Sequence, residues 1–149
     1  MAERPLELAT RKPDAAEVAR AKTLLATAKR LADGSVYLQP DAYANETVNM
    51  ADFPSSVKAK LQAIRIGGLG ITAIPCEVFV EIGLEIKARS PLKSSFTIEL
   101  ANGYNGYLPT AAHHQLGGYE TWRARSSYLE VDAASKITAT VLDLLNTVK

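Results

Sequence analysis

The stretch Leu69–Ile74, Leu-Gly-Ile-Thr-Ala-Ile, constrains the fold more than any other part of the sequence. It is almost continuously apolar, which is typical of a short strand buried inside a sheet. A second β-rich stretch, Lys58–Ile66, precedes it across Gly67-Gly68, and Pro75 ends the apolar run. We therefore expect a sheet with Leu69–Ile74 as a central strand, and a further strand over Phe96–Leu100.

Helical periodicity predicts three helices around this sheet. The first, over 14–32, opens with a capping box made by Asp14 and Glu17. The second spans 78–89, and the third follows Asp132 as its N-cap. One face of the third helix carries Ile137, Val141, Leu144, Leu145 and Val148.

Two stretches are predicted to be irregular. Residues 1–13 are charged and end in Lys12-Pro13, whereas residues 33–56 are interrupted by glycine, asparagine and proline, leaving only a short strand around Val36–Leu38. A loop of that length is unusual in a compact domain unless it is functional or packs against another part of the protein. The whole pattern predicts one domain, 1–149, of the α/β or α+β class. We expect a small, mostly buried sheet with flanking helices, forming an incomplete part of a larger layered domain.

Composition argues against several classes of protein. The chain has 17 basic and 16 acidic residues without a basic block, so neither nucleic acid nor an anionic membrane surface is expected as a partner. No apolar run has the length of a membrane span. The N-terminal residues lack the apolar stretch of a signal peptide, and localisation is left undetermined. The single cysteine, Cys76, excludes an internal disulfide, and a small buried residue is a better interpretation of it than a reactive thiol.

Glu77 is the first residue whose position suits chemistry. It follows the buried strand, in Ile74-Pro75-Cys76-Glu77, and stands where the helix over 78–89 begins. Ligands gather at strand ends in layered α/β folds, and a carboxylate at a helix N-terminus is stabilised as an anion that can bind a metal. The alternative is that Glu77 only caps the helix.

The second place is the turn over 102–110, which is rich in glycine and asparagine, together with Gly118 to Glu120. Three tyrosines project from this region: Tyr104, Tyr107 and Tyr119. A tyrosine hydroxyl can donate a hydrogen bond to an oxyanion or bind a metal as phenolate. The alternative is a tight turn whose tyrosines pack on the rim of the core, a role that we also expect for Trp122.

His113 and His114 are the only histidines. Neighbouring histidines point to opposite faces of a strand and lie about 100° apart on a helix, so the pair does not clamp one ion easily. We interpret both as solvated loop residues. The sequence also lacks a nucleophile elbow and a phosphate-binding glycine loop.

At these residues the sequence resembles the last portion of the catalytic domain of the neutral/alkaline, non-lysosomal ceramidase family. The resemblance is strongest over Ile64–Tyr119. It is carried by four motifs in order: Arg65-Ile66-Gly67 before the apolar strand, Pro75-Cys76-Glu77, the Asn-x-Tyr-x-x-Tyr turn from Asn102 to Tyr107, and Gly118-Tyr119-Glu120. The family usually has glycine at the position of Cys76.

The resemblance implies zinc-dependent hydrolysis of an amide bond, in an N-acyl lipid or another amide, with the acyl specificity left open. In the family, zinc is held by two histidines from earlier in the chain, and by a glutamate and a tyrosine that fall on Glu77 and Tyr107. A further tyrosine that stabilises the oxyanion falls on Tyr119. His113 and His114 match no ligand of the family.

The resemblance further implies a partner, the N-terminal half of the catalytic domain with its two histidines. Two protein ligands seldom hold zinc. We therefore expect the isolated chain to bind zinc weakly or not at all, and to be inactive as an amidase. The alternative is a stand-alone, non-catalytic binding or assembly domain whose exposed apolar patch is covered by self-association into a homo-oligomer. Members of the family are often secreted or membrane-associated.

Overall fold

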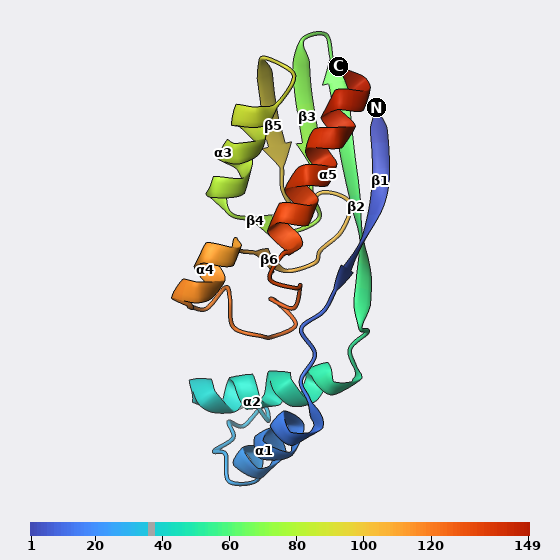
Figure 1. The fold of residues 1–149 in the computed structure, drawn as a ribbon. Helices are drawn as coiled ribbons and strands as arrows, with labels where there is room; N and C mark the ends of the chain where they lie inside the picture. The colour runs from blue at the N-terminus through green and yellow to red at the C-terminus, as the bar shows by residue number, and fades with distance from the viewer. Residues whose placement is uncertain (36–37) are drawn as a thin grey trace.

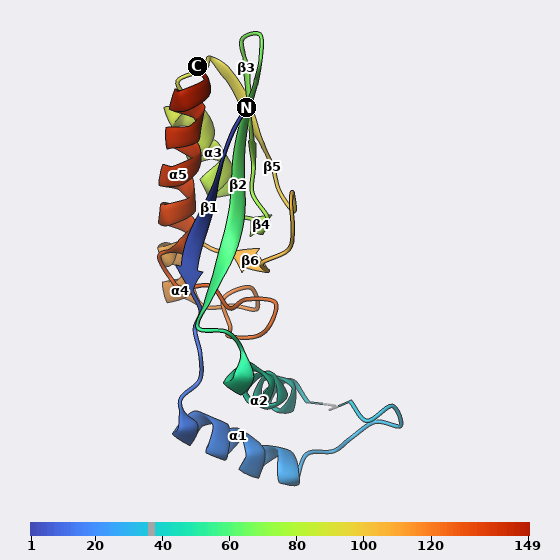
Figure 2. The same ribbon diagram turned by 90° about the vertical axis from the view of Figure 1, so that its right-hand side faces the viewer.

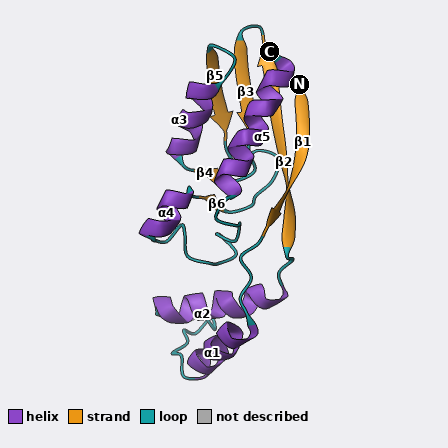
Figure 3. Cartoon of the chain, in the orientation of Figure 1, coloured by secondary structure: helices purple, strands orange, loops and turns teal. Residues whose placement is uncertain are grey.

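A computed structural model describes residues 1–35 and 38–149 as a mixed α/β fold, which confirms the predicted class (Figures 1 and 3). The elements in chain order are β1 (Ala2–Ala9), α1 (Ala15–Ala26), α2 (Gln39–Asn49), the 3₁₀ turn η1 (Met50–Asp52), β2 (Ser56–Ile66), β3 (Leu69–Ala73), β4 (Glu77–Val78), α3 (Val80–Arg89), β5 (Ser94–Ile98), β6 (Tyr107–Leu108), α4 (Ala111–Leu116) and α5 (Ala133–Val148).

The main sheet has four strands in the order β1-β2-β3-β5. β2 pairs antiparallel with both β1 and β3, whereas β5 runs parallel to β3 after the crossover through α3. The β2–β3 hairpin turns at Gly67, where φ is +59°. β3 is an inner strand as predicted, although Leu69 and Ile71 on one of its faces are only partly buried.

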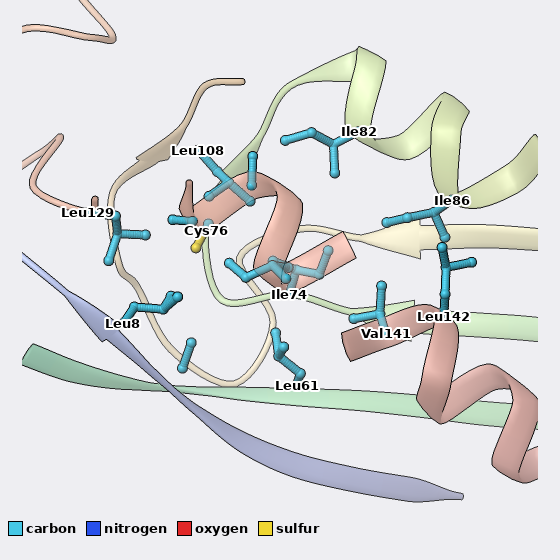
Figure 4. Close-up of a cluster of buried hydrophobic side chains, with 14 of the residues drawn as sticks. Leu8, Leu61, Ile74, Cys76, Ile82, Ile86, Leu108, Leu129, Val141 and Leu142 are labelled. Atoms are coloured by element: carbon cyan, nitrogen blue, oxygen red, sulfur yellow. The ribbon is translucent and has the colours of Figure 1, made fainter. Parts of the chain in front are cut away.

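One face of the sheet is covered by helices and holds the core. Figure 2 shows α5 and α3 on the same side of the sheet. Ile137, Val141 and Leu145 of α5 are fully buried, as their helical spacing predicts. In the core, α5 meets Leu8 of β1 and Leu61 of β2 (Figure 4).

The opposite face of the sheet carries exposed apolar side chains where the end of β2 meets β3 and β5. Ile64, Ile71 and Phe96 are neighbours across β2, β3 and β5, and lie on the side away from Gly70 and α5 because side chains alternate along a strand. Phe96 is 46% exposed, and Ile98, two residues further along β5, is 45% exposed. This row, with Ile66, Leu69 and Ile98, is called the open face below.

The prediction of an irregular segment over 1–13 was wrong for β1. Residues Ala2–Ala9 pair with β2 along their whole length. β1 is an edge strand, and Leu8 is its only fully buried side chain, so its charged residues remain in solvent. Pairing with β2 stabilises a segment whose composition alone does not favour a strand.

The prediction of an irregular segment over 33–56 was also wrong, since it contains α2 and η1. Pro40 lies in the first turn of α2, where a missing N–H breaks no helical hydrogen bond. The strand predicted around Val36–Leu38 falls on residues 36–37, which are outside the described part of the chain. The capping box of Asp14 and Glu17 is confirmed, but α1 ends at Ala26.

α1 and α2 pack together at one end of the molecule (Figure 1). Two ion pairs tie this helical hairpin to the segment after α4: Arg123 Nη2 lies 2.8 Å from Glu17 Oε1, and Arg125 Nη2 lies 2.7 Å from Glu46 Oε1. Within the described ranges, no helix combines the length and apolar character needed to cross a bilayer.

Candidate metal-binding site

Glu77 and Tyr107 are direct partners in the short parallel ladder of β4 and β6. The backbone N–H of Glu77 donates to Gly106 O at 2.9 Å. Because adjacent strands are about 4.8 Å apart and paired side chains point to the same side, the ladder sets the carboxylate beside the phenol. The N-cap of α3 is Phe79, so the alternative in which Glu77 only caps that helix was wrong.

The turn before Tyr107 is fixed by its backbone and by Asn105. Asn105 donates to Pro75 O from its backbone N at 2.7 Å and from its side chain at 3.2 Å, and it accepts from the Tyr128 hydroxyl at 2.9 Å. Gly106 follows with φ of +72°, and Tyr107 N donates to Ser126 O at 2.8 Å. These bonds hold Tyr107 in register with Glu77.

Arg11 positions the segment that carries Tyr119. Its guanidinium donates to Thr121 O at 2.8 Å, to Ser127 O at 2.7 Å and to Leu129 O at 2.8 Å. The ring of Tyr119 then lies 5.6 Å from that of Tyr107, at an angle of 72°. All three predicted site residues, Glu77, Tyr107 and Tyr119, therefore come together.

Tyr104 also belongs to this cluster, although we assigned it no role from the sequence. Its hydroxyl donates to Glu77 Oε1 at 2.9 Å. The Asn-x-Tyr-x-x-Tyr pattern contained the signal, since Tyr104 is the first of its two tyrosines. The carboxylate of Glu77 thus has the phenols of Tyr104 and Tyr107 as neighbours, and the ring of Tyr119 contacts that of Tyr107.

These phenols hold their protons strongly. The pKa of Tyr107 is raised to about 12 by desolvation, by the negative charge of Glu77, and by hydrogen bonding with Tyr119 and Glu77. The pKa of Tyr104 is raised by desolvation and by its hydrogen bond to Glu77. The raised pKa values of Tyr104 and Tyr107 keep these two phenols neutral at neutral pH, as hydrogen-bond donors beside Glu77.

The donors at the site suit a hard cation but do not complete its shell. A carboxylate and a phenolate are oxygen donors that zinc accepts, and a catalytic zinc site uses three protein ligands. Across residues 1–35 and 38–149, no three His, Cys, Asp or Glu side chains gather in a way that could hold a metal. Glu77 and Tyr107 therefore fit as part of a ligand set.

The two histidines are not in the cluster. They lie on α4, a short helix that the sequence did not predict, and both are partly buried rather than solvated. The ring of His113 packs on Phe79 at 4.7 Å and bonds Thr110 through Nδ1 at 2.7 Å. The interpretation of both histidines as solvated loop residues was therefore wrong.

Two other expectations are confirmed. Cys76 is fully buried, and burial raises the pKa of its thiol to about 12, which makes it unreactive. Trp122 is at the rim, 40% exposed, with its ring 5.0 Å from that of Tyr43 in an edge-to-face arrangement.

Comparison with known proteins identifies the fold. No protein-family model matches the chain, and no characterised protein matches it in sequence. Neutral ceramidase from Pseudomonas aeruginosa matches 95% of the chain with a TM-score of 0.55 and 17% identity, and a ceramidase complexed with C2 matches 78% with a TM-score of 0.54 and 17% identity. The chain spans 20% and 18% of the lengths of those two proteins. It therefore has the α/β fold of about one fifth of a neutral ceramidase.

Proposed function

We propose that this chain supplies part of the active site of a zinc-dependent amidase that resembles neutral ceramidase. Glu77 and Tyr107 are two zinc ligands, and Tyr119 donates to the oxyanion of the tetrahedral intermediate. The proposal is supported by the β4–β6 ladder, which pairs Glu77 with Tyr107, and by the contact between the rings of Tyr107 and Tyr119. The substrate is an N-acyl lipid or another amide.

Each residue has a distinct task in this proposal. Zinc bound there would activate a water molecule and polarise the amide carbonyl. Tyr104 occupies Glu77 Oε1, which leaves the second carboxylate oxygen for the cation. Tyr107 binds only as phenolate, and with a pKa of about 12 it loses its proton near neutrality only when a cation replaces that proton. Tyr119 donates from its hydroxyl, and such a donor contributes roughly 3 kcal/mol to an oxyanion.

The remaining ligands come from residues outside this chain, in our proposal. Two ligands are too few for firm binding of zinc, so the isolated chain binds it weakly and does not turn over substrate. The open face supports docking of a further layer, since Phe96 and Ile98 are 46% and 45% exposed there and α3 and α5 lie on the other side of the sheet (Figure 2). We assign that layer to the histidine-bearing half of the catalytic domain.

Tyrosine ultraviolet absorption tests the metal site directly. We expect the phenolate band of the purified chain to appear at lower pH when zinc is added at high concentration. The effect disappears in Tyr107→Phe and in Glu77→Gln, whereas Tyr43→Phe, which alters a tyrosine outside the ladder, retains it. A phenolate onset that zinc does not move, or that zinc moves equally in Tyr107→Phe, would contradict the assignment.

Two measurements test the claim that the site is incomplete. Metal analysis after dialysis is expected to show no stoichiometric zinc, and an assay of fatty-acid release from N-acyl amides is expected to show no turnover. Size-exclusion chromatography with light scattering then identifies what covers the open face. A stable dimer that dissociates in Phe96→Lys would favour self-association over a separate layer.

A further inference from the structure

A groove of about 330 Å³ lies between helix α3 and the outer edge of strand β5. Ser95, Phe96 and Thr97 all line it. Because side chains alternate between the two faces of a strand, three consecutive residues border one hollow only along the edge of that strand. The inner edge of β5 pairs with β3, and no other strand in the described part of the chain pairs with β5 (Figure 1). The groove therefore follows a free strand edge.

The free edge of β5 offers hydrogen-bonding groups to a ligand. An edge strand presents unpaired backbone N–H and C=O groups, to which another extended segment can add as a further strand. Ser95 adds a side-chain group, since it is only 6% exposed and lines the groove. Its Oγ has no hydrogen-bond partner among residues 1–35 and 38–149. A buried hydroxyl without a partner is unfavourable, so this position favours a ligand that bonds to it.

The strand pair on the other side of β5 shows which side chain suits Ser95. Thr97 lies on the same face as Ser95, and its Oγ1 is 2.9 Å from Oγ1 of Thr72. Thr72 and Thr97 are direct partners in the β3–β5 register. A serine or threonine on a strand added to the free edge could bond to Ser95 in the same way.

Helix α3 leaves room for an added strand at Gly83. Val80, Gly83, Leu84 and Lys87 follow helical spacing along one side of α3, and all four line the groove. Glycine is unfavourable inside a helix, yet nothing lies within 4 Å of an added Cβ at Gly83. The packing of the described residues therefore does not require glycine there. The missing side chain instead widens the groove.

The two ends of the groove carry opposite charges. Lys87 lies in the last turn of α3 and has no ion-pair partner in the described ranges. Glu99 lies at the other end, where its Oε2 accepts from Val78 N, just before the helix begins, at 2.9 Å. Between them, Val80 and Leu84 are 67% and 60% exposed. The groove thus has an apolar middle between a basic and an acidic end.

We propose that this groove, called the α3–β5 groove, binds an extended peptide segment that adds antiparallel to the free edge of β5. A serine or threonine of the peptide bonds to Ser95 Oγ, and its apolar side chains contact Leu84 and Phe96. An acidic side chain of the peptide lies near Lys87, and a basic one lies near Glu99. Backbone bonds supply the affinity, and these side chains supply the specificity. The α3–β5 groove shares no lining residue with the candidate metal site, so peptide binding is independent of the proposed function.

Backbone methylation of a probe peptide tests strand addition. The probe is a short capped peptide in which valine and threonine alternate between an N-terminal lysine and a C-terminal glutamate, with a fluorescent dye for anisotropy. In an added strand, only alternate residues direct their N–H groups to β5. We therefore expect saturable binding that is lost when one alternate set of amides, at either the valines or the threonines, is N-methylated, and is retained when the other set is.

Two variants of the protein test the walls of the groove. Gly83→Leu fills the groove and should weaken binding about tenfold, which corresponds to 1.4 kcal/mol. Ala88→Leu is its matched control, because Ala88 is exposed on the same helix and does not line the groove; its affinity should equal that of the wild type. Ser95→Ala should weaken binding about fivefold for the threonine peptide, and should have no effect on a peptide with alanine in place of threonine.

The proposal is overturned by any of four results. These are the absence of saturable binding, equal affinities of the two methylated peptides, equal affinities of Gly83→Leu and Ala88→Leu, and an equal effect of Ser95→Ala on the threonine and alanine peptides. Light scattering tests a different occupant. A dimer that dissociates in Gly83→Leu but not in Ala88→Leu would place a second copy of the chain in the groove, and would also overturn the proposal.

Discussion

Replacing Gly106 by alanine tests whether the site depends on the turn before Tyr107. Gly106 has φ of +72°, where alanine costs about 1–2 kcal/mol. An added Cβ would also lie 2.3 Å from Ser126 O, more than 1 Å inside the roughly 3.5 Å of a normal contact. The backbone has to move, which disrupts the bond from Tyr107 N to Ser126 O, worth about 1 kcal/mol net. With overpacking of about 1–3 kcal/mol, the total loss is roughly 3–6 kcal/mol.

Gly67→Ala is the control that separates the two causes. Gly67 has φ of +59° but nothing within 4 Å of an added Cβ. Gly67→Ala should therefore lower the free energy of unfolding only by the cost of the positive φ, about 1–2 kcal/mol. Urea unfolding followed by circular dichroism measures both variants. We expect Gly106→Ala to be less stable than Gly67→Ala by about 2–4 kcal/mol and to lose the zinc-dependent phenolate signal. Equal stabilities would refute the reasoning.

Three further predictions follow from the core and the surface. Leu145→Ala, at a fully buried position, should lower the free energy of unfolding by about 2–5 kcal/mol, whereas Leu116→Ala, 82% exposed, should change it by less than about 0.5 kcal/mol in the same urea titration. Cys76 should resist alkylation in the folded protein and react once urea unfolds it, as mass spectrometry would show; rapid labelling of the folded state would contradict its burial. The hydrogen bond from Arg123 lowers the pKa of Glu17 in the folded protein below its unfolded value of 4.5. The ionised Glu17 therefore stabilises the fold above pH 4.5, and this contribution to the free energy of unfolding is lost as the pH falls through the pKa of Glu17 in the folded protein. In Glu17→Gln this part of the acid sensitivity should vanish, and an unchanged slope of unfolding free energy against pH would show that the pair contributes nothing.

Elements specified by local signals were predictable from the sequence. The capping box of Asp14 and Glu17, the turn at Gly67 and the apolar face of α5 each depend on residues close in the chain. β1 was not predicted because it is stabilised by pairing with β2, and the residues of β2 lie about fifty positions later in the chain. α2 was not predicted because Pro40 was interpreted as a break in regular structure. Proline is also common in the first turn of a helix, which is where Pro40 lies.

The site was predictable only through the family resemblance. A parallel ladder of two residue pairs is too short to produce a periodic pattern in the sequence. The pairing of Glu77 with Tyr107 therefore has no local sequence signal. The hydrogen bond from the Tyr104 hydroxyl to Glu77 was not predicted, because the resemblance assigned no role to Tyr104. The hollow of about 460 Å³ that Tyr119 lines together with α2 was not predicted, because the sequence interpretation did not contain α2.

The place of α5 in the fold has a consequence for how the protein is made. Ala59, Leu61 and Ala63 of β2 are buried on the side that α5 covers, and the bridge between Thr10 and Leu129 joins residues more than a hundred positions apart. The strands therefore leave the ribosome well before the helix that shields them, and the nascent sheet has bare apolar surface on both sides during that interval. Such contacts between distant segments form slowly. A ribosome stalled before residue 133 should thus display a chain that chaperones bind, and folding should start only when α5 has emerged.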